Sequence, residues 1–594
     1  MAHAQLPISS LPLWQTLNNV SFDQRVRIAA IPGKGYGLVA DDDDVLAGNN
    51  SGNDASAAPL ITVPHGLVLH AGAVEEYAKQ DRHFRQLLDA TTVDVGHGTP
   101  RFDVLLFLLV QLVLARQQAA GDKPDTALPT PWTEYVRFLP HDVPLPTMWT
   151  DTERRLLHGT SLEAALAAKI VALELEFDRL HERSSDLPTW QAAFWERPSS
   201  LSSLGPQLRD WFVVDAWYRS RCLALPRSGA AMVPCIDMVN HSAAPNAYYD
   251  VRRDGDVVLL PRPPQAHQQD RQGQQGQQGQ QGQQDQQDHH EITISYGGDD
   301  DHDSKTAAEM LFSYGFVEPR SARRSLVLPF RHQLPGDPLA KAKLHAFGEP
   351  APCLTIDVGV ADADGAVDGD TDKHDKDEEN EAATPIRWSC PFAHLLCANE
   401  EDGLDFRLRQ ETDGSTQLRV FWQDADATDR ARDFAALTQA HALAPVFRLR
   451  VVTVLQEVVE AHLERMQAAG GGSGGSEGSE GSEGSEGSDS ECGDGDGEDG
   501  DHNNDFTTGN GQDIRSDVAA QAGRLRDVES RILSGALEAL EAERADLLAD
   551  TTVLAYLGST EVAGNDLARE AASNQEDHGD EAMHDGGAEE DDFS

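Results

Sequence analysis

Apolar positions recur along the chain with two different periods, which predict strands near the start and helices further on. Residues 26–31 and 37–40 are short apolar runs on either side of a glycine-rich turn, as in a β-hairpin. Between residues 161 and 180 the apolar side chains recur every three or four positions, which predicts one buried face of a helix. That face comprises Leu162, Leu166, Ile170, Leu173, Phe177 and Leu180. Thr160-Ser-Leu-Glu163 predicts a capping box at its start.

The same helical spacing returns in the last third of the chain, over residues 446–466 and 524–548. Its apolar stripes are Leu449, Val452, Leu455, Val459 and Leu463, and then Leu525, Val528, Ile532, Gly535, Ala539 and Leu540. Residues 257–260 and 292–295 are β-like runs that would be neighbouring strands without the insert between them. The run Val104–Ala115, broken only by Gln111, is too short to span a bilayer and predicts a buried helix.

The net charge of -52 is concentrated in a few segments rather than spread over the chain. Residues 361–382 hold ten acidic residues and two lysines, residues 471–505 hold twelve acidic residues without Lys or Arg, and residues 571–594 hold nine. Two low-complexity inserts, Gln268–Gln287 and Gly470–Asp505, repeat Gln-Gln-Gly and Gly-Ser-Glu units. Such segments bury little apolar area and are expected to be disordered. They either confer solubility or attract basic partners.

Length and cysteine content place broad limits on the class of protein. A chain of 594 residues is too long for one compact core, so two or more domains are expected. The six cysteines form no C-x2-C pair, so we expect no structural zinc cluster and no metal site. The start, Met1-Ala-His-Ala-Gln, lacks the basic and apolar regions of a signal peptide. These features predict an intracellular protein in the cytoplasm or the nucleus.

Three segments carry the candidate chemistry. They are Val233-Pro-Cys-Ile-Asp-Met-Val-Asn-His-Ser242, Ile292-Thr-Ile-Ser-Tyr-Gly297 and Tyr314-Gly-Phe316. A fourth segment, Gly33-Lys-Gly-Tyr-Gly37, could bring its backbone close to a ligand, although a plain hairpin turn explains it about as well.

Together the three segments resemble the SET-domain methyltransferases, which move a methyl group from S-adenosylmethionine to a lysine. The Asp237–Ser242 stretch is similar to the SET pattern almost letter for letter. Phe138–Trp149, Leu156–Leu162 and Ser220-Arg-Cys222 resemble the subclass whose SET domain is split by a helical insertion. That subclass includes the plant Rubisco and the fungal ribosomal-protein lysine methyltransferases.

The resemblance implies an α+β fold with small sheets and a knot-like crossing that brings residues 240 and 296 together. It implies a SET domain over residues 20–320, with a helical insertion at about 75–220 and a loop at 268–288. A mainly helical, substrate-binding-like domain would follow over residues 321–570. Disordered segments are expected at 361–384, 468–512 and 571–594.

The resemblance also implies roles for individual residues. Tyr296 would border the methyl-transfer channel as the catalytic residue, and Asp237 and Tyr249 would lie near the target lysine. S-adenosylmethionine would be held by Lys34, Gly35, Tyr36, Arg221, Asn240, His241, Tyr314 and Phe316. One departure is Thr306-Ala-Ala-Glu309, where many relatives have Ser-Asn-Ala-Glu, so an amide is missing at Ala307.

The expected activity is therefore methylation of a lysine in a basic protein such as a ribosomal protein or a histone. We expect a monomer without nucleic-acid or membrane partners. Two alternatives stay open: a non-catalytic binding module with the SET fold, and a methyltransferase with another acceptor such as histidine.

Overall fold

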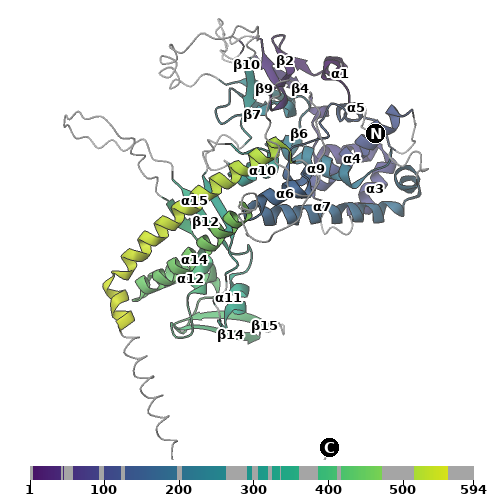
Figure 1. The fold of residues 1–594 in the computed structure, drawn as a ribbon. Helices are drawn as coiled ribbons and strands as arrows, with labels where there is room; N and C mark the ends of the chain where they lie inside the picture. Colours follow the sequence, from purple (N-terminus) through teal and green to yellow (C-terminus); the bar gives the residue numbers. More distant parts are fainter. Residues whose placement is uncertain are drawn as a thin grey trace, which may run out of the picture. The chain divides into compact units, whose positions relative to one another are not determined.

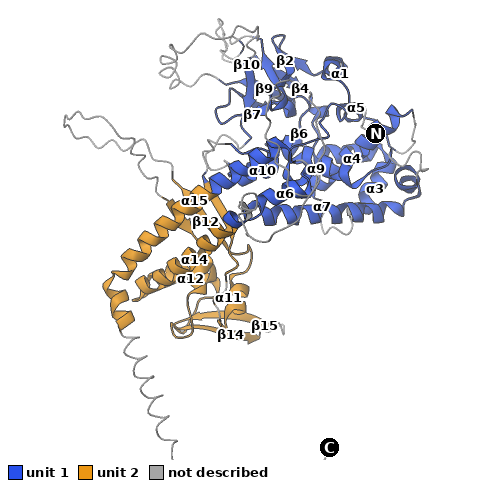
Figure 2. Ribbon diagram, in the orientation of Figure 1, with its two compact units in different colours: residues 1–324, 466–529 blue, residues 325–465, 530–594 orange. Residues whose placement is uncertain are grey.

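The structure is a computed structural model (Figure 1), and its chain divides into two compact units (Figure 2). Unit 1 comprises residues 1–324 and 466–529, and unit 2 comprises residues 325–465 and 530–594. The structure describes residues 5–41, 45, 58–92, 99–121, 127–196, 204–262, 290–296, 305–318, 324–332, 334, 336–359, 386–410, 416–470 and 514–558. The inserts and tails predicted to be disordered lie outside these ranges, except that residues 468–470 continue a helix.

The first sheet of unit 1 has four antiparallel strands in the order β1-β4-β9-β8. They are β1 (Ser21–Phe22), β4 (Ile61–Val63), β9 (Val257–Pro261) and β8 (Ala247–Val251). Strand β9 does not show the alternation of buried and exposed residues that a surface strand would show, because four of its five residues are enclosed. This strand therefore lies inside the unit, with neighbours on both sides.

The second sheet of unit 1 has the order β2-β3-β10-β7. Its strands are β2 (Val26–Ile31), β3 (Gly35–Ala40), β10 (His290–Ile294) and β7 (Asn240–His241). The predicted hairpin is confirmed, with β3 beginning two residues before the predicted run. The expectation that residues 257–260 and 292–295 pair as neighbours is wrong, because β9 and β10 belong to different sheets.

Strand β7 pairs with β10 in parallel, although β10 pairs with β3 in the antiparallel sense. Thr293 lies opposite Asn240, and Ile294 lies opposite His241. Parallel neighbours need a crossover connection between them. The chain makes this crossover between β7 and β10 through the first sheet, since β8 and β9 intervene in the sequence. This topology brings two distant parts of the chain together, as the resemblance implied.

Helices make up most of the rest of unit 1 (Figure 2). They include α1 (Leu11–Leu17), α2 (Ala71–Gln80), α3 (Arg82–Thr92), α4 (Pro100–Ala119), α5 (Pro131–Tyr135), α6 (Asp151–Arg154), α7 (Leu162–Ser185), α8 (Pro188–Trp190), α9 (Leu208–Arg221) and α10 (Ala307–Tyr314). A short hairpin of β5 (Cys222–Leu225) and β6 (Gly229–Met232) follows α9. This set covers the region where the resemblance implied a helical insertion.

Helix α4 is the centre of the main core. It is longer than the apolar run from which it was predicted, and its 20 residues are long and apolar enough to cross a membrane by composition alone. Almost its whole circumference is enclosed, from Phe102 to Ala115. A helix that is apolar all round and packed inside a unit is a core helix, as predicted.

Helix α7 forms as predicted, but its first turn is built differently. The predicted capping box is wrong, because the Thr160 hydroxyl donates to the Leu157 carbonyl instead. Ser161 is the N-cap, and its N–H and hydroxyl both donate to the carboxylate of Glu529, at 2.9 and 2.5 Å. A residue 368 positions away thus replaces the local cap.

A second apolar cluster of unit 1 joins α7 and α10 to the first part of α15 (Ser516–Leu548). Its enclosed members are Trp149, Leu157, Leu162, Leu166, Ala307, Leu311, Val317, Val518, Ala522 and Leu525. Residues 516–529 therefore belong to unit 1 and contribute to the same apolar cluster as α10, although the predicted boundary put them in the C-terminal domain.

Unit 2 is helical and also contains two three-stranded antiparallel sheets. The first has the order β11 (Ser325–Pro329), β12 (Cys353–Val358) and β13 (Ile386–Ser389). The second has β14 (Leu404–Gln410), β15 (Thr416–Trp422) and β16 (Ala425–Asp426). Its helices are α11 (Ala340–Phe347), α12 (Pro391–Leu396), α13 (Phe434–Gln439) and parts of α14 (Ala444–Gly470) and α15.

Candidate active site

The candidate site begins where β7 and β10 end side by side. Ser242 N donates to the Ile294 carbonyl at 3.0 Å, which extends the parallel pairing by one residue. Two residues further along the second segment, Tyr296 N donates to Nδ1 of His241 at 3.0 Å. The Asn-His and Tyr-Gly segments, 55 residues apart in sequence, are therefore tied together by their backbones and one imidazole.

An aromatic group of four residues surrounds this junction. The ring centroids of His241 and Tyr296 lie 5.1 Å apart, and those of His241 and Phe316 lie 5.7 Å apart. Tyr314 completes the group, with its ring 4.6 Å from that of Tyr296 and 6.4 Å from that of Phe316. The structure therefore brings together four of the residues singled out from the sequence. We call His241, Tyr296, Tyr314 and Phe316 the aromatic group.

The two tyrosine hydroxyls of the aromatic group point to backbone carbonyls. Tyr296 donates to the Val239 carbonyl at 2.6 Å, and Tyr314 donates to the Tyr296 carbonyl at 3.3 Å. Burial raises the pKa of Tyr296 well above its ordinary value and raises that of Tyr314 to about 12. Both phenols are therefore neutral at physiological pH, and each keeps oxygen lone pairs that can accept a further hydrogen bond.

A carboxylate that the sequence did not single out, Glu291 on β10, links two of the predicted residues. Its Oε1 accepts from the Asn240 amide at 2.9 Å, and its Oε2 lies 2.7 Å from the Lys34 ammonium. Lys34 belongs to the turn between β2 and β3, where Gly33 and Gly35 have φ of 73° and 79°. Positive φ is easily adopted only by glycine. The glycine turn is thereby fixed to the strand that carries Asn240.

Gly37 shows how closely this turn approaches the site. A Cβ added to Gly37 would lie 2.5 Å from Nδ2 of Asn240. Any other residue at this position would displace the amide. By contrast, a Cβ on Gly35 would meet nothing within 4 Å, and the Tyr36 side chain is 47% exposed. Gly35 and Tyr36 thus stay on the outside of the hairpin and do not join the aromatic group.

Asp237 lies in a closed polar group behind the site. Its side chain is 0% exposed, and its Oδ1 accepts from the Tyr135 hydroxyl at 2.5 Å. The Tyr135 hydroxyl in turn accepts from the backbone N–H of Cys235, a residue whose φ is 72°. Arg221, the last residue of α9, donates to the Asp237 carbonyl at 3.0 Å. A direct contact between Asp237 and a substrate stays a prediction, since these partners enclose the carboxyl group.

Burial raises the pKa of Asp237 above its ordinary value, and the Arg221 guanidinium opposes this only in part. The distance from Arg221 to Asp237 Oδ2 is 3.7 Å, which is too long for a hydrogen bond. Within the described residues, Oδ2 of Asp237 and Nε of Arg221 are both enclosed without a hydrogen-bond partner. Asp237 and Arg221 are therefore close in space without a direct side-chain hydrogen bond between them.

The last predicted residue, Tyr249, lies on β8. Its hydroxyl donates to the Ala224 carbonyl at 3.4 Å, and its proximity to Tyr314 contributes to the raised pKa of that phenol. Ala307, the position of the departure from the family pattern, is 9% exposed and packs in the second apolar cluster with residues of α15. An amide at this position would be placed among apolar side chains.

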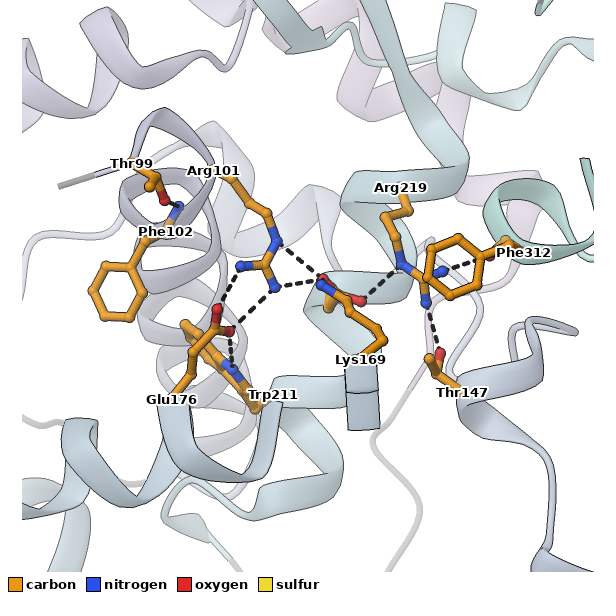
Figure 3. A network of polar contacts seen from close by, with 10 residues as sticks. Thr99, Arg101, Phe102, Thr147, Lys169, Glu176, Trp211, Arg219 and Phe312 are labelled. Carbon is orange, nitrogen blue, oxygen red and sulfur yellow. Dashed lines mark hydrogen bonds and ion pairs between the residues drawn. The ribbon is translucent and has the colours of Figure 1, made fainter. Parts of the chain in front are cut away.

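Helix α10, which carries Tyr314, is anchored by an enclosed network around Asp215 of α9 (Figure 3). Asp215 is 0% exposed and lies 2.6 to 2.9 Å from three cations, those of Arg101, Lys169 and Arg219. Arg219 also donates to the Phe312 carbonyl of α10 and stacks over the Phe312 ring at 4.6 Å. The network therefore fixes α10 against α9 two residues before Tyr314.

Several of these contacts were missed in the sequence because their partners are distant. Glu318 follows Tyr314-Gly-Phe316 by two residues, and its Oε2 lies 3.0 Å from Nε2 of His241. Proximity to the motif could have indicated Glu318. Nothing local indicates Tyr135, which lies 102 residues from Asp237. Within the described ranges, no group of three or more His, Cys, Asp or Glu side chains could hold a metal ion.

Comparison with known proteins identifies the fold. No protein-family model matches the chain. The SET domain-containing protein 8 of Schizosaccharomyces pombe is 25% identical over 413 residues, which cover 69% of this chain and 77% of that protein. The chain also superimposes on the crystal structure of the SET domain of LSMT bound to lysine and AdoHcy. The TM-score is 0.50 and the identity 15%, over 91% of this chain and 92% of the other.

A second crystal structure of the SET domain of LSMT, bound to methyllysine and AdoHcy, gives a TM-score of 0.51. Its identity is 16%, over 91% of this chain and 93% of the other. The similarity to these solved structures shows that the chain has the SET fold, which agrees with the parallel β7–β10 pairing. The similarity to these structures extends over 91% of the chain.

Proposed function

We propose that this protein is an S-adenosylmethionine-dependent methyltransferase that modifies a lysine side chain of a basic protein. The observation that carries the proposal is the aromatic group, formed where β7 and β10 meet in a SET fold. The matched LSMT structures hold AdoHcy together with lysine or methyllysine. A location in the cytoplasm or nucleus and a monomeric state stay predictions.

The residues around the aromatic group fit the proposed cofactor. Asn240 offers an amide, the glycine turn brings backbone close to that amide, and Arg221 offers a guanidinium on a side chain that is 18% exposed. A guanidinium suits a carboxylate such as that of an amino-acid moiety. When bound, S-adenosylmethionine would supply the methyl group on its sulfonium. Asn240, His241, Arg221 and Phe316 are the residues that would hold it.

The acceptor must be a neutral amine, because a protonated lysine has no lone pair to attack with. At a reference pKa of about 10.4, deprotonating lysine at pH 7 costs about 4.6 kcal/mol. An enclosed apolar setting lowers that cost because it disfavours the ammonium form. The aromatic side chains of Tyr296, Tyr314 and Phe316 provide such a setting.

Tyr296 would orient the amine rather than deprotonate it. Its own proton is committed to the Val239 carbonyl, and its raised pKa keeps the phenol neutral. The remaining lone pairs of its oxygen can accept an N–H from the amine and turn the nitrogen lone pair away from the phenol. Positioning of this kind is a large source of rate in displacement reactions.

The proposal is tested by incubating the full chain with isotopically labelled S-adenosylmethionine and a mixture of ribosomal proteins and histones. We expect label on lysine, located by mass spectrometry of the digested proteins. Calorimetry of S-adenosylmethionine alone is the second arm. Binding without transfer to any of these proteins would favour a binding module, and label on histidine would change the acceptor. Absence of both binding and transfer would refute the proposal.

A further inference from the structure

The protonation pattern of His241 follows from its two contacts. Tyr296 N is a backbone amide and can only donate, so Nδ1 of His241 must be the acceptor and carry no proton. A neutral imidazole has its one proton on the other nitrogen. Nε2–H therefore points to Oε2 of Glu318, 3.0 Å away. His241 is thus held as one of its two tautomers by one contact on each nitrogen.

Glu318 favours the same tautomer as the Tyr296 N–H does. A carboxylate accepts but does not donate, so it favours the proton on Nε2. With the proton on Nδ1, two donors would face each other at Tyr296 N, and Nε2 would present a lone pair to a carboxylate. The side chains of His241 and Glu318 are only 7% and 18% exposed, so water can compensate little for either mismatch.

The tautomer matters because Nδ1 fixes the backbone of Tyr296. Tyr296 lies just beyond the end of β10, where ladder hydrogen bonds no longer hold the chain. Its N–H bond to His241, its hydroxyl bond to Val239 and the bond from the Tyr314 hydroxyl to its carbonyl position this residue. Loss of the first bond would leave the backbone of Tyr296 held by the longer 3.3 Å bond from the Tyr314 hydroxyl.

The segment that carries Glu318 is itself held from a distant part of unit 1. Val317 N donates to Oε1 of Gln521 on α15 at 2.8 Å. The Val317 side chain is 2% exposed and packs in the second apolar cluster, which α15 completes. Val317 immediately precedes Glu318 in the sequence. Its hydrogen bond to α15 therefore fixes the backbone from which the Glu318 side chain extends.

We propose that Glu318 is a positioning residue: its carboxylate stabilises the Nε2–H tautomer of His241 and so strengthens the bond from the Tyr296 backbone to Nδ1, while Gln521 positions Glu318 through Val317. The inference rests on the proposed function for its effect on turnover, but not for its effect on the tautomer. It assigns a role in the site to residues about 200 positions apart in the sequence.

The tautomer is measured on the full chain labelled with 15N-histidine, by two-bond 1H–15N spectra. The His241 signals are those missing from the His241→Gln variant. We expect an unprotonated Nδ1 and a protonated Nε2 in the wild type and in Glu318→Gln, whose amide oxygen still accepts. Glu318→Ala should show a measurable share of the tautomer with a protonated Nδ1, since only the Tyr296 N–H then disfavours it. A protonated Nδ1 in the wild type, or an unchanged tautomer in Glu318→Ala, would overturn the inference.

Turnover gives a second readout. We expect kcat to fall about ten-fold or more in Glu318→Ala and to recover within about three-fold in Glu318→Gln. Gln521→Ala should lower kcat by a smaller factor, whereas Arg524→Ala, an exposed change on the same helix, should not. Equal losses in Glu318→Ala and Glu318→Gln would also contradict the inference. If the wild type transfers no methyl group, the proposed function fails, and the tautomer still decides the role of Glu318.

Discussion

Two enclosed carboxyl groups of unit 1, those of Asp215 and Asp237, have pKa values shifted in opposite directions. Both side chains are 0% exposed. Burial alone would raise the pKa of Asp215, but Arg219, Lys169 and Arg101 together hold it below its ordinary value. Asp237 has one arginine at 3.7 Å and one phenol, and its pKa is raised. Burial thus tells little about a carboxyl group until its partners are counted.

The difference matches what each carboxylate supports. Asp215 joins three cations, and through Arg219 it fixes α10, so it must stay charged. Asp237 fixes the turn before β7, which presents the Val239 carbonyl to Tyr296. A neutral acid or an amide could do that equally well. We therefore expect the charge of Asp215 to be essential for stability and that of Asp237 to be dispensable.

The largest expected effect comes from removing the charge of Asp215. In Asp215→Asn the cations of Arg101, Lys169 and Arg219 remain enclosed with one carboxylate fewer. Breaking a buried ion pair on one side typically costs about 3–5 kcal/mol. Urea unfolding should show a loss of that size, while Asp178→Asn, an exposed change on α7, should leave stability within about 0.5 kcal/mol. A loss below 1 kcal/mol in Asp215→Asn would mean that the network tolerates a neutral centre.

The next effect concerns Glu529, a third enclosed carboxylate, which resembles Asp237 more than Asp215. Burial raises its pKa to about 7, and the hydrogen bonds from Ser161 oppose this only in part. Between the unfolded pKa of 4.5 and pH 7 the folded chain keeps a proton that the unfolded chain has lost. Stability from this group is therefore full below pH 4.5 and falls as the pH rises through 7.

Glu529→Gln removes this dependence and keeps an acceptor for Ser161 N–H. Relative to the variant, the wild type should lose up to about 3 kcal/mol of unfolding free energy between pH 5 and pH 8. Urea unfolding of both proteins at several pH values measures the difference. Parallel curves for the two proteins would show that Glu529 ionises normally in the folded state.

A smaller effect is expected on turnover when Tyr296 loses the hydroxyl that contacts the Val239 carbonyl, in the turn that Asp237 supports. Tyr296→Phe removes the hydroxyl that contacts the Val239 carbonyl, and with it the orienting oxygen. We expect kcat to fall about ten-fold or more, equivalent to about 1.4 kcal/mol, with S-adenosylmethionine affinity nearly unchanged. Tyr248→Phe on β8 is the matched control and should turn over normally. Normal turnover by Tyr296→Phe would remove Tyr296 from the catalytic residues.

The sequence predicted what short-range patterns determine. Strand β2 was predicted with its observed bounds, and the enclosed face of α7 follows from helical spacing alone. The meeting of residues 240 and 296 was predicted only through resemblance to the SET domain, since no local pattern encodes a parallel pairing across two intervening strands. His241 and Tyr296, at the ends of the paired segments, were found in this way, and Tyr314 and Phe316 were found through the third motif.

The partners of those residues could not be predicted, because they come from tertiary contacts. Glu529 displaced a locally favourable capping box on α7, from 368 residues away. Tyr135 and Arg221 turned Asp237 into an enclosed residue, and Gln521 reached Val317 from beyond the predicted domain boundary. In each case an ionisable or amide group contacts a partner that is distant in the sequence. The spacing of residues along the chain does not indicate such a contact.

The smallest expected effect is that of Asp237→Asn, the same substitution as at Asp215 but with a different neighbourhood. The amide oxygen can still accept from the Tyr135 hydroxyl, and only a distant arginine loses its counter-charge. Because the folded-state pKa is raised, the charge lowers stability as the pH rises above the unfolded pKa of about 3.9. We expect unfolding free energies within about 1 kcal/mol of the wild type at pH 5, and a relative gain for the variant at pH 8. A loss comparable with that of Asp215→Asn would show instead that Arg221 and Asp237 form a true buried ion pair, and the contrast between the two carboxylates would disappear.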